Sequence, residues 1–233
     1  MATAQELAAA IDHTLLKPDM RISDVERLCA EARAHRFAAV CLPPCYVDVA
    51  AELLADTPVE VATVVGFPLG YSTTASKVAE TAEAVDRGAT EIDVVVNISR
   101  LCSGDLVSVG EELAAVVQAA RPGPSPAGNT VKVIIETAYL DEDGKRDAAQ
   151  LVRDSGADFI KTSTGFAPAG ASVDDVALLA ELLAGEVEVK ASGGIRTLAD
   201  AEAMLAAGAS RLGVSAGVAI IKEATQAAER GLQ

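Results

Sequence analysis

The chain has few of the residues on which metal sites, disulfide frameworks and stacking surfaces for bases are built. Its 233 residues include two histidines, four cysteines and no tryptophan, and only 3% of them are aromatic. Two histidines far apart in sequence give no recognisable zinc-binding spacing, and four cysteines do not make a disulfide framework in a chain this long. We therefore expect a reduced protein without a bound metal ion.

Basic residues are also scarce. The 19 lysines and arginines face 34 acidic residues, which gives a formal net charge of −15. Nucleic acids and anionic membranes attract basic surfaces, so we expect neither as a partner. There is no apolar run long enough to span a bilayer, and the amino terminus, with Glu6 and Asp12 and no basic start, does not resemble a signal peptide. These features predict a cytoplasmic protein.

What the chain does have is apolar mass, since half of its residues are hydrophobic. This content excludes disorder as the main state, and the length suits one domain spanning residues 1–233. Short β-branched runs alternate with longer alanine-rich helical patterns throughout. The predicted strands are Ala10–His13, Ala38–Leu42, Val59–Val65, Glu91–Asn97, Val131–Glu136, Phe159–Thr162, Glu186–Ala191 and Arg211–Ser215.

Eight strands, each followed by a helical pattern, indicate repeated βα units. Nearly continuous apolar runs such as Val94–Val96 and Val133–Ile135 are typical of parallel strands that are covered on both faces. We therefore predict an α/β fold, a single-domain (β/α)8 TIM barrel with a short N-terminal helix. An open, doubly wound sheet is the alternative, but it usually has fewer strands.

Local signals place some helix ends and connections. The patterns Ser23-x-x-Glu26 and Thr197-x-x-Asp200 predict capping boxes at two helix starts. The Pro- and Gly-rich stretch Arg121–Asn129 is predicted to be a connection without function at the face where the strands begin.

A short repeat indicates which residues share one depth in the barrel. A Gly-Ala pair precedes the fourth, sixth and eighth strands, and the fifth residue after each of these glycines is Asp93, Lys161 or Gly213. Alternate strands of a TIM barrel contribute to the same interior layer. We therefore expect Asp93 and Lys161 to face each other across the interior.

Lys161 is the strongest candidate for chemistry, because it ends a strand that should be buried. A buried lysine is costly unless it is paired, so one interpretation is a structural ammonium that reaches water or a carboxylate. The other is an amine with a lowered pKa that attacks a carbonyl group and forms a Schiff base. Reactivity near neutral pH would require a shift of roughly three units from the ordinary pKa of about 10.4.

Three further residues could tune that amine. Lys190 ends the next strand, about 5 Å away, and two neighbouring ammonium groups lower the pKa of the less solvated one. Alternatively, Lys190 only pairs with an acid such as Asp93 or Glu136. Asp93 lies inside an apolar strand, and with two lysines nearby we favour a general acid/base role over a purely neutralising one. Asp12, at the end of the first strand, could orient Lys190 or a substrate hydroxyl, or be structural.

Glycine-containing loops after the last two strands indicate an anion site. Gly193 and Gly194 follow the seventh strand, and Ser215 and Ala216 follow the eighth at a helix start, which is the usual phosphate position on this fold. Arg196 adds a possible charge. We expect a small phosphorylated ligand held locally by loop amides and a few cations.

Several other readings are excluded or left unassigned. The run Gly213–Gly217 matches a G-x-S-x-G nucleophile elbow, but no histidine follows Ser215 to act as its base. There is no Walker A motif and no G-x-G-x-x-G, so no nucleotide cofactor is expected. Cys41 is expected to be a packed small hydrophobic residue rather than a thiol at the barrel mouth.

Six motifs, in order between about Ile11 and Ile221, resemble the deoxyribose-phosphate aldolase family. They are Ile11-Asp12-His13-Thr14, Val64-Val65-Gly66-Phe67-Pro68, Glu91-Ile92-Asp93-Val94-Val95, Lys132-Val133-Ile134-Ile135-Glu136-Thr137, Phe159-Ile160-Lys161-Thr162-Ser163-Thr164-Gly165 and Lys190-Ala191-Ser192-Gly193-Gly194-Ile195-Arg196. The resemblance implies reversible cleavage of 2-deoxy-D-ribose 5-phosphate to D-glyceraldehyde 3-phosphate and acetaldehyde, with no metal or cofactor. The alanine-rich outer helix faces fit a monomer, a homodimer or a homotetramer, so the sequence leaves the oligomeric state open.

By this resemblance, Lys161 forms the Schiff base, Lys190 tunes it and Asp93 is the acid/base partner. The implied substrate- and phosphate-binding residues are Asp12, Thr164, Gly165, Gly193, Gly194, Arg196, Ser215 and Ala216. Ala216 stands where some members have a second serine, and can still offer its backbone amide. Some longer members end in a tail with a tyrosine, whose step would here fall to water or another group. Alternatives are a phosphosugar isomerase or epimerase, and a non-catalytic phosphosugar-binding barrel.

Overall fold

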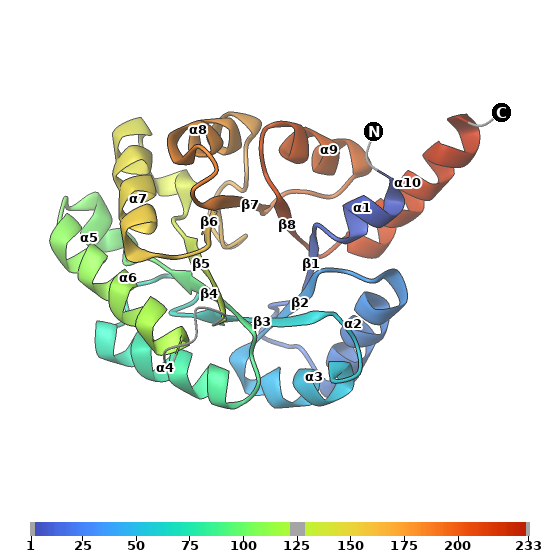
Figure 1. The fold of residues 1–233 in the computed structure, drawn as a ribbon, viewed down its shortest axis with the longest axis horizontal. Helices are drawn as coiled ribbons and strands as arrows, with labels where there is room; N and C mark the ends of the chain where they lie inside the picture. The colour runs from blue at the N-terminus through green and yellow to red at the C-terminus, as the bar shows by residue number, and fades with distance from the viewer. Residues whose placement is uncertain (1–2, 122–128, 232–233) are drawn as a thin grey trace.

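The computed structural model describes residues 3–121 and 129–231, and its centre is a closed barrel of eight parallel strands (Figure 1). Each strand pairs with the next along the chain, and β8 closes the barrel on β1. The strands are β1 (Ile11–Thr14), β2 (Ala39–Leu42), β3 (Glu60–Val65), β4 (Glu91–Val95), β5 (Thr130–Ile134), β6 (Phe159–Lys161), β7 (Glu188–Ser192) and β8 (Arg211–Val214). All eight predicted strands are confirmed, and no boundary is more than two residues from its prediction.

Helices surround the barrel as a ring, and the short N-terminal helix α1 lies beside α10. The helices are α1 (Ala4–Ala8), α2 (Ile22–His35), α3 (Val47–Leu54), α4 (Thr74–Asp86), α5 (Ile98–Cys102), α6 (Leu106–Ala120), α7 (Glu142–Ser155), α8 (Val173–Leu183), α9 (Leu198–Ala206) and α10 (Gly217–Gly231). Two 3₁₀ turns follow strands, η1 (Pro44–Tyr46) after β2 and η2 (Thr137–Tyr139) after β5. None of the helices in the described part of the chain combines the length and apolar character needed to cross a membrane.

The two faces of the strands pack in different surroundings. Along β4, Ile92 and Val94 belong to the large apolar core between the strands and the helices, whereas Asp93 between them is fully buried outside that core. Since strand side chains alternate, Asp93 points into the barrel. A second, smaller apolar cluster is formed by Ala39, Cys41, Ala62 and Val64 of β2 and β3. This confirms that Cys41 is a packed residue, with none of its surface exposed.

Strand register sets the layer from which the site is built. Lys161 of β6 is opposite Lys190 of β7, and Asp93 of β4 is opposite Lys132 of β5. Gly213 of β8 is opposite Asp12 of β1. A Cβ atom at Gly213 would lie 3.2 Å from Cε of Lys190, so the glycine leaves space for the lysine stem.

One predicted helix start is confirmed and the other is wrong. Thr197 caps α9, accepting a hydrogen bond from the Asp200 amide while Asp200 accepts one from the Thr197 amide. At α2, by contrast, the helix begins at Ile22, and the Asp24 carboxylate accepts a 3.0 Å bond from the Arg21 amide. Ser23 therefore lies inside the first turn. The interpretation of Arg121–Asn129 falls mostly on residues 122–128, which lie outside the described residues.

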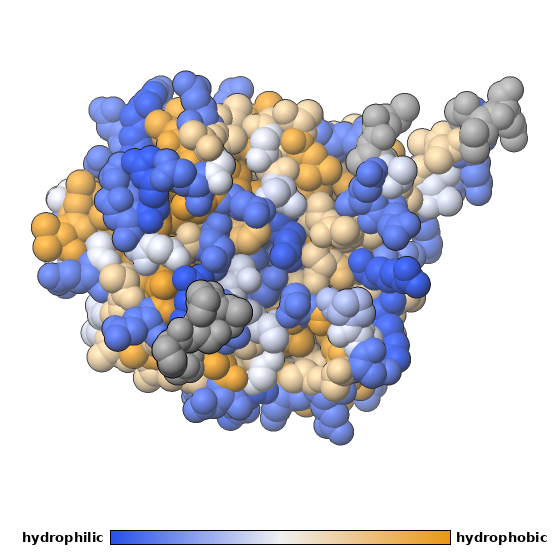
Figure 2. Space-filling view, in the orientation of Figure 1, coloured by the Kyte–Doolittle hydropathy of each residue, from blue (hydrophilic) through white to orange (hydrophobic). Residues whose placement is uncertain are grey.

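On the surface, hydrophilic residues gather over the middle of the molecule, and hydrophobic ones form separated patches over the helical ring (Figure 2). This distribution fits a chain that carries a formal net charge of −15.

The two helix starts give a matched stability test. Thr197→Ala removes a side-chain cap and should lower the free energy of unfolding by about 1 kcal/mol. Ser23→Ala removes no cap and should change it by less than about 0.5 kcal/mol. Urea unfolding monitored by circular dichroism measures both, and an equal loss in the two variants would contradict the assignment of the α2 start.

Candidate active site

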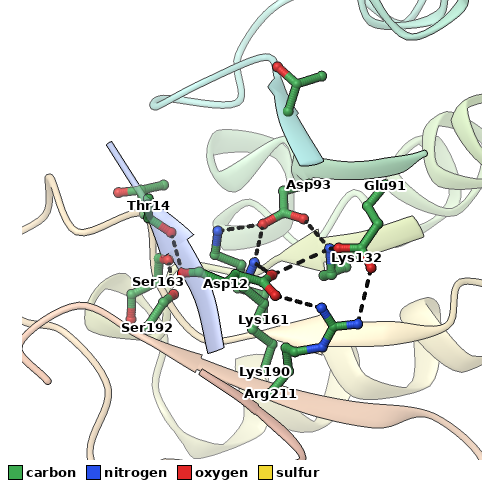
Figure 3. A network of polar contacts seen from close by, with 12 residues as sticks. Asp12, Thr14, Glu91, Asp93, Lys132, Lys161, Ser163, Lys190, Ser192 and Arg211 are labelled. Carbon is green, nitrogen blue, oxygen red and sulfur yellow. Dashed lines mark hydrogen bonds and ion pairs between the residues drawn. The ribbon is translucent and has the colours of Figure 1, made fainter. Parts of the chain in front are cut away.

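Seven ionisable side chains meet inside the barrel, drawn from six of its eight strands (Figure 3). Six of them have side chains no more than 3% exposed, and the seventh, Arg211, is 16% exposed. We refer to them as the charge cluster: Asp12, Glu91, Asp93, Lys132, Lys161, Lys190 and Arg211. All are joined by ion pairs, as buried charges must be if their burial is not to cost several kcal/mol each.

Asp93 is the centre of the charge cluster. Its Oδ2 accepts hydrogen bonds from Nζ of Lys161 and Nζ of Lys190, both at 2.7 Å, and its Oδ1 accepts one from Nζ of Lys132 at 2.9 Å. The expectation that Asp93 and Lys161 face each other is therefore confirmed. Lys190 also pairs with Asp12, so the acids it contacts are Asp12 and Asp93 and not Glu136.

The carboxylates of the cluster also form ion pairs with two cations other than Lys161 and Lys190. Lys132 contacts Glu91 at 2.5 Å, and Arg211 bonds Asp12 at 2.6 Å and Glu91 at 3.0 Å. The sequence interpretation gave no site role to Lys132, Glu91 or Arg211. The signal for Lys132 was present, because it stands between Val131 and Val133 in an apolar strand as Lys161 stands in its own.

The charges of the cluster do not balance unless one cation is neutral. Three carboxylates face four cationic groups, so the cluster is electroneutral only when one of the four has lost its proton. Burial lowers the pKa of Lys161 below its ordinary value; the charge of Asp93 opposes this shift, and that of Lys190 adds to it. For Lys190, the nearby charges of Asp12 and Asp93 outweigh burial and raise the pKa. Among the lysines of the cluster, Lys161 is therefore the one whose pKa is lowered.

The acid at the centre responds in the opposite sense. Burial by itself would raise the pKa of Asp93, but Lys132, Lys161 and Lys190 together hold that pKa well below its ordinary value. Asp93 is thus a carboxylate that stabilises positive charge next to it. Burial also raises the pKa of the nearby Cys41 thiol to about 11, so the thiol adds no charge to the interior at neutral pH.

A cavity of about 270 Å³ opens above Lys161, walled by the loops that follow β1, β6, β7 and β8. Seven of the predicted site residues line it: Lys161, Thr164, Gly165, Gly193, Gly194, Arg196 and Ser215. The charge cluster beneath the cavity contains three more of the predicted residues, Asp12, Asp93 and Lys190. Asp93 contacts Lys161 directly, Lys190 contacts Asp93, and Asp12 contacts Lys190. Ala216 lies beside Ser215 in the wall of a neighbouring cavity.

The part of the wall made of glycine can hold an anion. Gly165, Gly193 and Gly194 have φ values of +85°, +84° and +85°, in the left-handed region that favours glycine. Among the described residues, none accepts a hydrogen bond from the amide N–H groups of these three glycines. Two exposed cations, Arg196 and Lys17, complete this wall. The sequence interpretation missed Lys17, which lies in the loop after β1, where no local pattern fixes the path of the chain.

No group of three or more His, Cys, Asp or Glu side chains is arranged to hold a metal ion in the part of the chain that the structure describes.

The arrangement combines a buried amine of lowered pKa, a carboxylate beside it and a glycine-rich wall with free amides, and comparison with known proteins places the chain in a family. The family model described as DeoC/LacD family aldolase matches residues 7–223. The chain belongs to this aldolase family.

Similar proteins cover almost the whole of this family member. A deoxyribose-phosphate aldolase of Thermoanaerobacter sp. (strain X514) is 52% identical over 217 residues, which are 93% of this chain and 96% of that protein. Deoxyribose-phosphate aldolase 2 of Staphylococcus aureus (strain MSSA476) is 50% identical over 92% of this chain and 95% of its own length. The solved structure of the tetrameric deoxyribose phosphate aldolase from Aeropyrum pernix superposes with a TM-score of 0.86 at 34% identity, covering 94% of this chain and 91% of that chain.

The space beside Lys190 is tested by Gly213→Ala in this aldolase. The added Cβ would lie 2.9 Å from Cβ of Ser192 and 3.2 Å from Cε of Lys190. Overpacking of this kind should lower the free energy of unfolding by about 1–3 kcal/mol. The control is Gly110→Ala in α6, where the new Cβ would make an ordinary 3.4 Å contact with Leu151. It should be stabilising by about 0.5–1 kcal/mol. Urea unfolding measures both variants. A Gly213→Ala variant with an unchanged free energy of unfolding would contradict the tight packing at this position.

Proposed function

We propose that the chain is a deoxyribose-phosphate aldolase that works through a Schiff base on Lys161. It would cleave 2-deoxy-D-ribose 5-phosphate reversibly to D-glyceraldehyde 3-phosphate and acetaldehyde. One observation carries the proposal: of the seven members of the charge cluster, Lys161 is the one that lines the cavity, and its pKa is the one among the lysines there that is lowered. The names of the similar proteins support the same substrate.

The first half of the reaction uses the neutral amine. Nζ of Lys161 attacks the aldehyde carbon of the open-chain sugar, and the adduct takes up one proton and loses water to give an iminium ion. This proton is released again when the last iminium is hydrolysed. The positive nitrogen then lies next to the Asp93 carboxylate, which is 2.7 Å from Nζ and stabilises the new charge. The cluster thus exchanges a neutral lysine for a cationic iminium without moving its other charges.

The second half breaks the carbon–carbon bond. A base removes the proton from the C3 hydroxyl, the C2–C3 bonding electrons flow into the iminium, and glyceraldehyde 3-phosphate leaves an enamine behind. Protonation of the enamine at C2 and hydrolysis of the resulting iminium release acetaldehyde and restore the amine. We assign the proton transfers to Asp93, with Lys190 holding its carboxylate in place through the shared Oδ2 contact.

The phosphate group would bind at the wall of glycines. The free amides of Gly165, Gly193 and Gly194, the Ser215 hydroxyl, the Ala216 amide at the start of α10 and the charge of Arg196 are suited to a dianion. Asp12 would act through Lys190, with which it pairs. The assembly we propose is a homodimer or homotetramer, in line with the tetrameric Aeropyrum pernix structure, and a monomeric mass by light scattering would contradict it.

Trapping with borohydride tests the covalent step. In the presence of 2-deoxyribose 5-phosphate, reduction should fix a stable adduct on Lys161, which peptide mass spectrometry locates. Lys161→Arg should abolish turnover, because a guanidinium does not lose its proton in a protein and cannot form the imine. Lys145→Arg, at a partly buried ion pair with Asp175 on the helical ring, should keep both turnover and adduct. Turnover without an adduct would favour an isomerase, and an adduct on another lysine would refute the assignment.

The pH profile tests the tuning role of Lys190. The charge of Lys190 lowers the pKa of Lys161, so Lys190→Leu should raise that pKa. Since the amine reacts only above its pKa, the acidic limb of kcat/KM should move to higher pH, with kcat reduced at least ~100-fold. Lys222→Ala, at an exposed position of α10, should leave the profile in place. An acidic limb that does not move in Lys190→Leu would count against the tuning role.

A further inference from the structure

Glu136 adopts a backbone conformation that its position does not require. Its φ is +53°, and only two other non-glycine residues among those described, Arg36 and Ala184, have a positive φ. Those two are the residues that end α2 and α8, where a left-handed conformation is common. Glu136 instead follows β5 at the mouth of the barrel, two residues after the strand ends. Such strain persists where the surrounding structure enforces it, and it is often found at functional sites.

The conformation directs a buried carboxylate sideways onto the next loop. Glu136 is 1% exposed, and its two oxygens accept hydrogen bonds from the Thr164 amide at 3.3 and 3.2 Å. One of them also accepts a bond from the Thr164 hydroxyl. Both donors of Thr164 are therefore taken up by Glu136, and this residue of the β6–α8 loop has none left for a ligand.

The same contact fixes the residues on either side of Gly165. The Thr164 hydroxyl, while donating to Glu136, accepts a 3.1 Å bond from the Phe166 amide. Of three consecutive amides, those of residues 164 and 166 thus have acceptors, and among the described residues the Gly165 amide has none. The loop is anchored again farther on, where the Ala171 amide donates to the carbonyl oxygen of Gly193 at 3.0 Å.

We propose that Glu136 is a positioning residue for the phosphate group of the substrate, acting through Thr164 to hold the Gly165 amide in the anion-binding wall. Glu136 itself does not touch the substrate. This proposal rests on the proposed function, because it assumes that the ligand is a phosphosugar. It adds a residue that sets phosphate affinity from outside the cavity wall, and it accounts for a strained backbone that the reaction at Lys161 does not need.

The role predicts a loss specific to phosphorylated ligands. Glu136→Gly removes the carboxylate and also the strain, since glycine adopts this φ freely, so the variant should fold. Its KM for 2-deoxyribose 5-phosphate should rise about tenfold or more. Its kcat/KM for unphosphorylated 2-deoxyribose should stay within about twofold, because that sugar has no phosphate group to bind at the wall. Ala184→Gly, which relieves a positive φ far from the site, is the matched control and should change neither value.

Two variants of Thr164 separate the hydroxyl contact from general stability. Thr164→Val keeps the amide bond to Glu136 but loses the hydroxyl, and should raise KM for the phosphorylated sugar in the same direction. Thr164→Ser restores the hydroxyl and should return KM to within about twofold of the starting value. An equal loss on both sugars in Glu136→Gly and Thr164→Val, or no loss on either, would overturn the proposal.

Binding of inorganic phosphate, followed by NMR titration, tests the inference without turnover. The unsubstituted protein should bind it more tightly than Glu136→Gly, and Ala184→Gly should bind it as the unsubstituted protein does. If the unsubstituted protein cleaves neither sugar, the proposed function fails, while a weakened phosphate titration in Glu136→Gly still supports this role. Equal phosphate affinity in the unsubstituted protein and Glu136→Gly would contradict the role whatever the enzyme turns over.

Discussion

The ion pairs around Asp93 are the constraint on which the rest of the site depends. Three lysine amines converge on one carboxylate that has no exposed surface, and such an arrangement is stable only while the charges compensate one another. Because the cationic groups outnumber the carboxylates by one, one proton is in excess. Lys161 contacts a single carboxylate, whereas Lys132 contacts three and Lys190 two, so the excess proton is lost most easily from Lys161. Lys161 is also the member of the cluster that lines the cavity, which is why we propose it as the nucleophile.

The barrel makes this crowding possible. Parallel strands point alternate residues inward, so that β4, β5, β6 and β7 each contribute a charged side chain to the barrel interior, while the outward residues form the apolar core. Gly213 leaves space for the Lys190 stem, and the loops after the strands add the anion-binding wall. In our proposals, the chemistry takes place in the charge cluster and the phosphate binds in the wall above it, so that Glu136 would serve phosphate binding through Thr164.

Much of this was readable from the sequence, for definite reasons. Strands covered on both faces are continuous apolar runs, so their limits were predicted to within two residues. Lys161 and Asp93 stood out because a charge within such a run needs a partner. Lys132, between Val131 and Val133, carried the same signal but was given no role. The predicted start of α2 at Ser23 was wrong. The Asp24 carboxylate accepts a hydrogen bond from the Arg21 amide, and the helix therefore begins one residue before Ser23, at Ile22. The contact of Glu136 with Thr164 depends on the left-handed φ of Glu136, which no local sequence pattern predicts.

The protonation order of the lysines tests the central claim most directly. NMR of the protein labelled with ¹⁵N at its lysine side chains, titrated without substrate, would follow each Nζ, with Lys161→Arg assigning one signal and Lys190→Leu another. We predict that the Lys161 amine titrates below the ordinary lysine value of about 10.4 while Lys190 and Lys132 stay protonated. A Lys161 amine that titrates at or above that value, or a Lys190 that loses its proton first, would contradict it.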